Sequence, residues 1–167
     1  MAFQLRSEAE AYFKGVSGSP AFRSKFDQYY LCLMLGLASG RNERAIAAVD
    51  LVDYFIADYK PVGRLIVALL VVAEAHRLGV ELSEKSELKT LLDDYLDATQ
   101  PANITALAFQ KMNDYANGGF IVLNEALPDR PRHVETFFQL YAKLLDDQMA
   151  KTTRWDSYRA ALIAQAG

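Results

Sequence analysis

The stretch Phe26-Asp-Gln-Tyr-Tyr-Leu-Cys-Leu-Met-Leu-Gly-Leu-Ala-Ser-Gly40 decides the fold, because its apolar side chains recur at spacings of three and four. That spacing puts them on one face of an α-helix. Ser19-Pro20 before it predicts an N-cap followed by proline at the first helical position, and Gly40 predicts the end of the helix. The sequence therefore predicts a long buried helix near the N-terminus.

The residues before this helix predict a short extended segment and a first, smaller helix. Phe3-Gln-Leu-Arg6 reads as extended chain, and Ser7-Glu-Ala-Glu10 has the form of a capping box. The first helix should then run from Glu8 to about Val16. Glycine and serine at 15–19 predict the turn that joins the two helices.

Apolar spacing and Gly, Pro and Ser signals predict five more helices downstream, with a short final one around 155–164. The segment 62–78 is apolar on nearly all sides, which favours a helix at the centre of a bundle, although its β-branched content leaves a buried strand as the alternative. Asn117-Gly-Gly119 interrupts the sixth pattern, so the state of 120–127 stays open. The five helices are expected over 43–59, 62–78, 84–98, 103–116 and 133–149.

Composition fits one compact domain. The chain has 167 residues, of which 51% are hydrophobic and 23% charged, with a formal net charge of -3. We expect an all-α, single-domain bundle over 1–167, with about seven helices around the central helix 62–78. The N-terminus lacks the apolar core of a secretion signal, and no apolar run approaches the roughly 20 residues of a membrane span, so a cytoplasmic protein without membrane contact is expected.

The residue types that carry most enzyme chemistry are sparse. Cys32 is the single cysteine and lies in an apolar run, which indicates a core residue, and His76 and His133 are far apart in sequence. Asp93 and Asp97 could share a divalent cation at i and i+4. Together with Asp94, however, they read as the solvated face of a helix. We therefore expect no catalytic residue, no metal and no cofactor, and a protein that is not an enzyme.

Basic residues of the N-terminal region provide the candidate site. They lie at helix starts and in the loops around the first two helices, where side chains and amides suit phosphate contacts. Interleaved acidic residues, such as Glu10 and Glu43, keep an ordinary solvated surface as the alternative. The candidate DNA-binding residues are Arg6, Lys14, Arg23, Lys25, Arg41 and Arg44.

Three segments together, Phe3-Gln-Leu-Arg6, Ser7-Glu-Ala9 and Tyr30-Leu-Cys-Leu-Met-Leu-Gly-Leu37, resemble the small helical E-component of bacterial DNA sulfur-modification (phosphorothioation) systems. The resemblance covers residues 3–40. It implies a cytoplasmic, non-enzymatic component of a DNA modification or phage-defence assembly. Members of that family bind DNA, preferentially nicked duplex, through a lysine-rich surface and self-assemble, whereas this chain has only Lys14 and Lys25 as lysines over that stretch.

The resemblance implies protein partners in such an assembly, with duplex DNA and a second copy of the chain as further partners. The alternative is a structural or adaptor helical bundle with no nucleic-acid partner.

Overall fold

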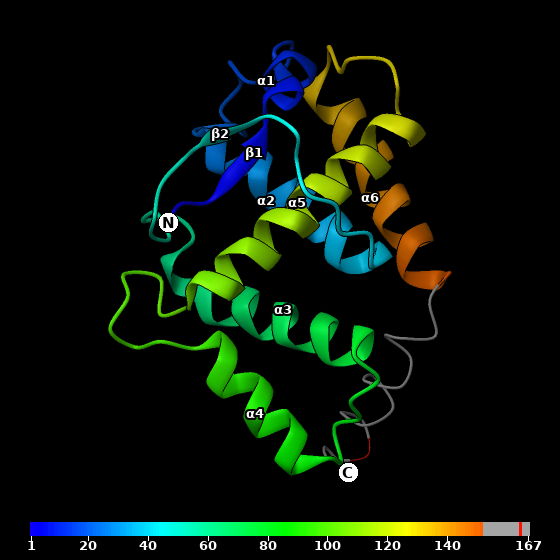
Figure 1. Ribbon diagram of the computed structural model, residues 1–167. Helices are drawn as coiled ribbons and strands as arrows, with labels where there is room; N and C mark the ends of the chain where they lie inside the picture. Colours follow the sequence, from blue (N-terminus) through cyan, green and yellow to red (C-terminus); the bar gives the residue numbers. More distant parts are fainter. Residues whose placement is uncertain (152–163, 165–167) are drawn as a thin grey trace.

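The computed structural model describes residues 1–151 and Ala164, and within them six α-helices and one small sheet make up the molecule (Figure 1). The mostly helical fold predicted from sequence is confirmed, with six helices in the described part of the chain rather than seven. The short helix predicted over 155–164 lies outside the described residues, apart from Ala164. The helices are α1 (Ser7–Phe13), α2 (Lys25–Ser39), α3 (Gly63–Arg77), α4 (Lys85–Tyr95), α5 (Ala106–Ala126) and α6 (Val134–Ala150); the strands are β1 (Gln4–Arg6) and β2 (Ala48–Asp50), and a 3-10 turn, η1, covers Lys60–Val62.

The long helix predicted near the N-terminus is α2, but it begins later than Ser19-Pro20. The backbone amide of Ser24 donates to Oδ2 of Asp27 at 2.7 Å, which caps the first turn, and the chain from 19 to 24 forms turns instead. The helix ends where expected, at Gly40, whose φ of +75° is one that glycine adopts without strain.

The closest contact between helices is the crossing of α2 and α5. A Cβ atom added to Gly36 would lie 1.9 Å from the carbonyl oxygen of Tyr115, and one added to Gly119 would lie 1.8 Å from that of Cys32. The two backbones therefore touch, and both glycines lie where any side chain would separate the helices. The sequence left the state of 120–127 open, and this crossing explains why Asn117-Gly-Gly119 does not end the helix. α5 continues to Ala126, and close packing offsets the roughly 1 kcal/mol by which each helical glycine disfavours the helix.

An aromatic cluster fixes the N-terminal chain to this pair of helices. The buried ring of Phe3 lies 5.2 Å from Phe26, 5.3 Å from Tyr29 and 4.8 Å from Phe109, measured between ring centroids. The side chain of Asn113 on α5 accepts from the amide of Gln4 at 2.9 Å and donates to the carbonyl of Ala2 at 3.0 Å. β1 is thus held against α5 by both apolar packing and hydrogen bonds.

The helix predicted over 43–59 is wrong. In its place β2 pairs antiparallel with β1, with Leu5 opposite Val49, and Phe3 exchanges backbone hydrogen bonds with Leu51 and Val52. The N-terminal strand β1 provides a hydrogen-bonding partner for residues 48–50, and β-branched residues such as Val49 favour extended backbone. Tertiary pairing therefore overrides the helical periodicity of this segment.

The helix predicted over 62–78 is confirmed as α3, so the strand alternative is excluded, but its central position is wrong. Leu65 is 60% exposed and Leu78 is 53% exposed, while Leu70 is fully buried. α3 therefore buries one face against the rest of the molecule, and α2 and α5 form the centre (Figure 1). None of the helices in the described part of the chain is long and apolar enough to span a bilayer.

Replacement of Gly119 by alanine tests the crossing. We expect Gly119→Ala to lower the free energy of unfolding by about 3 kcal/mol or more, because the new methyl group meets backbone atoms that cannot move aside cheaply. Gly18→Ala is the matched control, since a Cβ there meets nothing within 4 Å and its cost should stay below about 1 kcal/mol. Urea denaturation followed by circular dichroism measures both. Equal stability of the two variants would contradict the close crossing.

Cys32 provides a second test, because its thiol is fully buried and burial raises its pKa well above the ordinary value. We expect a thiol reagent at neutral pH to label the native protein on the order of 10³ times more slowly than the urea-unfolded chain, since labelling then requires opening of the core. Rapid labelling without denaturant would contradict the predicted core position of Cys32.

Candidate nucleic-acid interface

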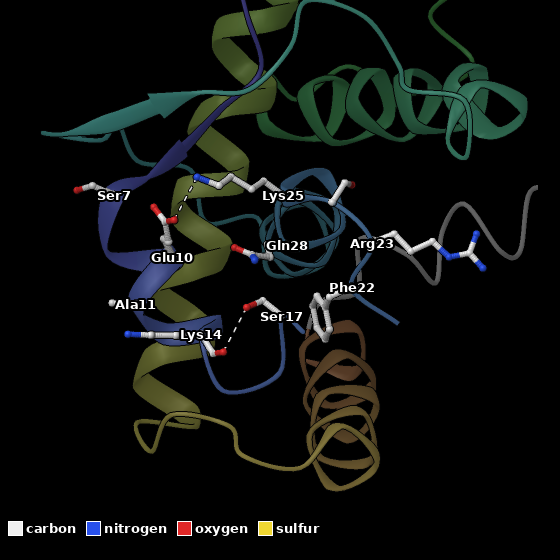
Figure 2. Close-up of a pocket in the computed structure, with 10 residues that line it drawn as sticks. Ser7, Glu10, Ala11, Lys14, Ser17, Phe22, Arg23, Lys25 and Gln28 are labelled. Atoms are coloured by element: carbon white, nitrogen blue, oxygen red, sulfur yellow. Dashed lines mark hydrogen bonds and ion pairs between the residues drawn. The ribbon is translucent and has the colours of Figure 1, made fainter. Parts of the chain in front are cut away.

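A hollow of about 600 Å³ lies between α1 and the start of α2, and we call it the first hollow (Figure 2). Three of the six candidate DNA-binding residues line it: Lys14, Arg23 and Lys25. Its full lining is Ser7, Glu10, Ala11, Lys14, Ser17, Phe22, Arg23, Ser24, Lys25 and Gln28.

The three cations stand around the rim of the first hollow and do not converge in its middle. Figure 2 shows Lys14 and Arg23 directed to opposite sides, and the ammonium of Lys25 turned toward Glu10, 3.2 Å from its Oε1. Arg23 lies 3.8 Å from Asp58 in a pair that is mostly exposed, and Lys14 has no ion-pair partner in the described chain. Exposed pairs of this kind contribute little and break readily for a stronger ligand. The rim suits an extended anion better than one small phosphate.

The other three candidates lie elsewhere. Arg41 and Arg44 follow the C-terminal end of α2, whose 15 residues separate them from Lys25 by about 22 Å at 1.5 Å per residue. Arg41 is bound by Glu43 at 2.8 Å and Glu125 at 2.7 Å, whereas Arg44 is exposed. Arg6, in β1, pairs with Glu8 at 3.0 Å, and this hydrogen bond lowers the pKa of the Glu8 carboxyl. The structure therefore divides the six residues between separate places.

A second hollow, of about 700 Å³, lies beside the connection between α5 and α6. It contains two arginines, Arg130 and Arg132, that the sequence analysis did not select. The sequence carries their signal, as two arginines and a histidine within four residues at the start of the helix predicted over 133–149. Its full lining is Tyr12, Leu127, Pro128, Asp129, Arg130, Pro131, Arg132, His133, Thr136, Phe137 and Leu140.

The chain just after α1 contacts this connection, which lies beside α1 (Figure 1). A Cβ on Gly15 would lie 2.3 Å from the carbonyl oxygen of Pro131 and 3.6 Å from the Cα of Arg132, so the chain after Lys14 packs directly on the loop. The hydroxyl of Tyr12 also donates to the carbonyl of Leu127 at 2.8 Å. Together the two linings carry five basic and two acidic side chains, in a chain whose net charge is -3. The two linings together therefore carry a formal charge of +3.

The acidic residues of α4 lie at the opposite end of the molecule from α1 (Figure 1). Asp93 and Asp94 are exposed, and Asp93 pairs with Lys89. Asp97 accepts from the hydroxyl and the amide of Thr99, which lowers its pKa. Among the described residues, no three His, Cys, Asp or Glu side chains gather as metal ligands would.

One buried polar cluster has no counterpart in the sequence analysis. The fully buried carboxylate of Glu74 accepts from Arg77 Nε and Nη2 at 2.8 and 2.7 Å and from the hydroxyls of Tyr95 and Tyr115 at 2.7 and 2.8 Å. Burial alone would raise the pKa of this carboxyl, but the hydrogen bonds from Arg77, Tyr95 and Tyr115 outweigh it and hold the pKa below its ordinary value. Glu74 lines neither hollow, so it serves to join α3, α4 and α5.

Comparison with known proteins adds nothing to this geometry: no family model, no curated protein and no solved structure matches the chain. The function of the chain must therefore be inferred from the two hollows, from the buried groups and from the resemblance of residues 3–40.

The Glu74 cluster predicts an acid-sensitive fold. The ordinary pKa of a glutamate carboxyl is about 4.3. Because the pKa of Glu74 is lower than this in the folded protein, the stability that Glu74 contributes is present above that pH and is lost as the pH falls through the folded pKa. Glu74→Gln should cost about 2–3 kcal/mol at pH 7, since charged hydrogen bonds are lost while the partly exposed Arg77 regains water.

Urea denaturation between pH 7 and pH 3 measures this effect. The variant should lose less stability than the wild type over that range, because it lacks the carboxyl that must be protonated. Parallel pH profiles for the two proteins would contradict the assignment.

Proposed function

We propose that this chain is a non-enzymatic helical component of a bacterial DNA modification or phage-defence assembly, acting through contacts to other proteins and to duplex DNA. The observation that carries the DNA contact is the concentration of five basic against two acidic side chains at one end of an acidic protein. A local positive surface of this kind attracts the phosphate backbone, which supplies most of the affinity in sequence-independent binding.

The state of the reactive groups supports a non-catalytic role. A raised pKa and full burial keep Cys32 from acting as a nucleophile in the folded protein. The carboxylate of Glu74 is occupied by four hydrogen-bond donors and lies away from both hollows. Neither group is available to a substrate.

The second candidate function is an adaptor bundle with no nucleic-acid partner. The observation that favours it is the outer face of α3, where Leu65 is 60% exposed and Leu69 and Val72, at i+4 and i+7, are half-buried. Apolar side chains at this spacing share one face of a helix and suit a protein partner. In the first proposal the same surface serves the protein contacts of the assembly.

Charge reversal distinguishes the two functions. Binding of a fluorescent 20-base-pair duplex, intact or nicked, is measured by anisotropy at 50 mM salt. The triple variant Lys14→Glu, Arg23→Glu, Lys25→Glu should abolish binding and keep its circular dichroism spectrum, because the three side chains are exposed or in exposed pairs.

Two controls carry the same kind of charge change elsewhere. Arg44→Glu, at the other end of α2, should weaken binding much less, and Asp93→Lys with Asp94→Lys on α4 should leave it unchanged or stronger. Equal losses in the triple variant and in Arg44→Glu would contradict the first hollow as the contact. Absence of binding by the wild type to either duplex would eliminate the DNA role and leave the adaptor function.

A further inference from the structure

The second hollow is lined by basic side chains that have no partner among the described residues. Arg130, Arg132 and His133 are exposed, and none of them takes part in an ion pair or a side-chain hydrogen bond within the described residues. Asp129 is the one acidic residue in the lining, and Glu135 follows in the first turn of α6. Two guanidinium groups on a loop of seven residues therefore face solvent and bind no other side chain in the described part of the chain.

The chemistry of this hollow fits phosphate groups. Guanidinium presents a planar fork of donors that matches phosphate oxygens, and two of them lie on this one short loop. The hollow also adjoins the start of α6, where His133 is the N-cap residue and no described side chain caps the first amides. Those amides and the positive end of the helix dipole add to the attraction for an anion.

The apolar walls of the hollow exclude base stacking. Tyr12 is 3% exposed and Phe137 is 2% exposed, so neither ring offers a face to a nucleobase, and the Tyr12 hydroxyl is engaged by Leu127. Proteins that bind single strands depend on such faces. The surface thus offers charge without stacking, which matches the phosphates on the outside of a duplex.

We infer that the connection between α5 and α6 binds the phosphate backbone of duplex DNA through Arg130 and Arg132, and continues the interface of the first hollow past Lys14. The chain that follows Lys14 packs on this loop at Pro131, so the cations of the two hollows lie on neighbouring segments, and cations spread over such segments suit a polyanion with one charge per about 1.7 Å of helix axis. The inference extends the DNA binding of the proposed function and depends on it.

The test compares salt dependence of duplex binding in full-length variants. Arg130→Gln with Arg132→Gln should lower the slope of log Kd against log salt by about 1.8, since each phosphate contact contributes roughly 0.9. Arg64→Gln on α3 is the matched control, because it removes one exposed arginine outside both hollows and should leave the slope unchanged. Circular dichroism verifies the fold of each variant.

The outcomes separate this inference from the proposed function. If the Arg130/Arg132 variant keeps the wild-type slope while the Lys14/Arg23/Lys25 variant loses binding, the inference is overturned and the proposed function stands. If the wild type binds no duplex, both are overturned.

Inorganic phosphate that displaces the duplex far better than chloride at equal ionic strength would show a site for one small phosphate and would overturn the backbone assignment. Binding of polyglutamate in place of duplex, with the same dependence on the two arginines, would also overturn it.

Discussion

The backbone contact between α2 and α5 is the constraint on which the other packing depends. Glycine at 36 and at 119 lets each helix reach the carbonyl oxygens of the other, at Tyr115 and Cys32. This crossing places Asn113 against the N-terminal chain, and it sets the direction of Tyr115, whose hydroxyl reaches Glu74 on α3. A single close approach therefore determines where β1 enters the fold and where α3 is attached.

The same crossing positions the two hollows. α2 begins beside α1 and forms one wall of the first hollow, while α5 ends beside α1 and leads into the loop of the second. Because Gly15 packs on the backbone of Pro131, a side chain at position 15 would move the loop away from α1. The basic residues of both hollows lie at the ends of helices or in loops. No charged group has to be buried in the core to place them there. α4 lies at the other end of the molecule, and its last turn carries the exposed Asp93 and Asp94 (Figure 1).

Sequence reasoning recovered the elements that local signals specify. Periodicity and end signals located α1, α4 and α6 to within a few residues and α2 at its C-terminal end, and the apolar run around Leu70 predicted α3. It failed where distant segments decide the outcome. Glycines that break isolated helices are required in α5 because another backbone touches them, and 48–50 is a strand because β1 lies beside it. Half of the candidate basic residues, Lys14, Arg23 and Lys25, line one hollow. The packing of the chain after Lys14 on the loop that carries Arg130 and Arg132 depends on a contact between Gly15 and Pro131, more than a hundred positions apart.

Native-state hydrogen exchange tests the central role of this crossing most directly. If the contact between α2 and α5 holds the fold together, the amides around Cys32–Gly36 and Tyr115–Gly119 exchange only through global unfolding and share one free energy of opening, equal to that from urea denaturation. Amides of α4, which buries little more than Leu91 and Tyr95, should open at lower free energy. If the amides of α2 and α5 exchanged with a lower free energy of opening than those of α3 and α4, the account would be contradicted. The rest of the fold would then persist after the crossing of α2 and α5 had opened.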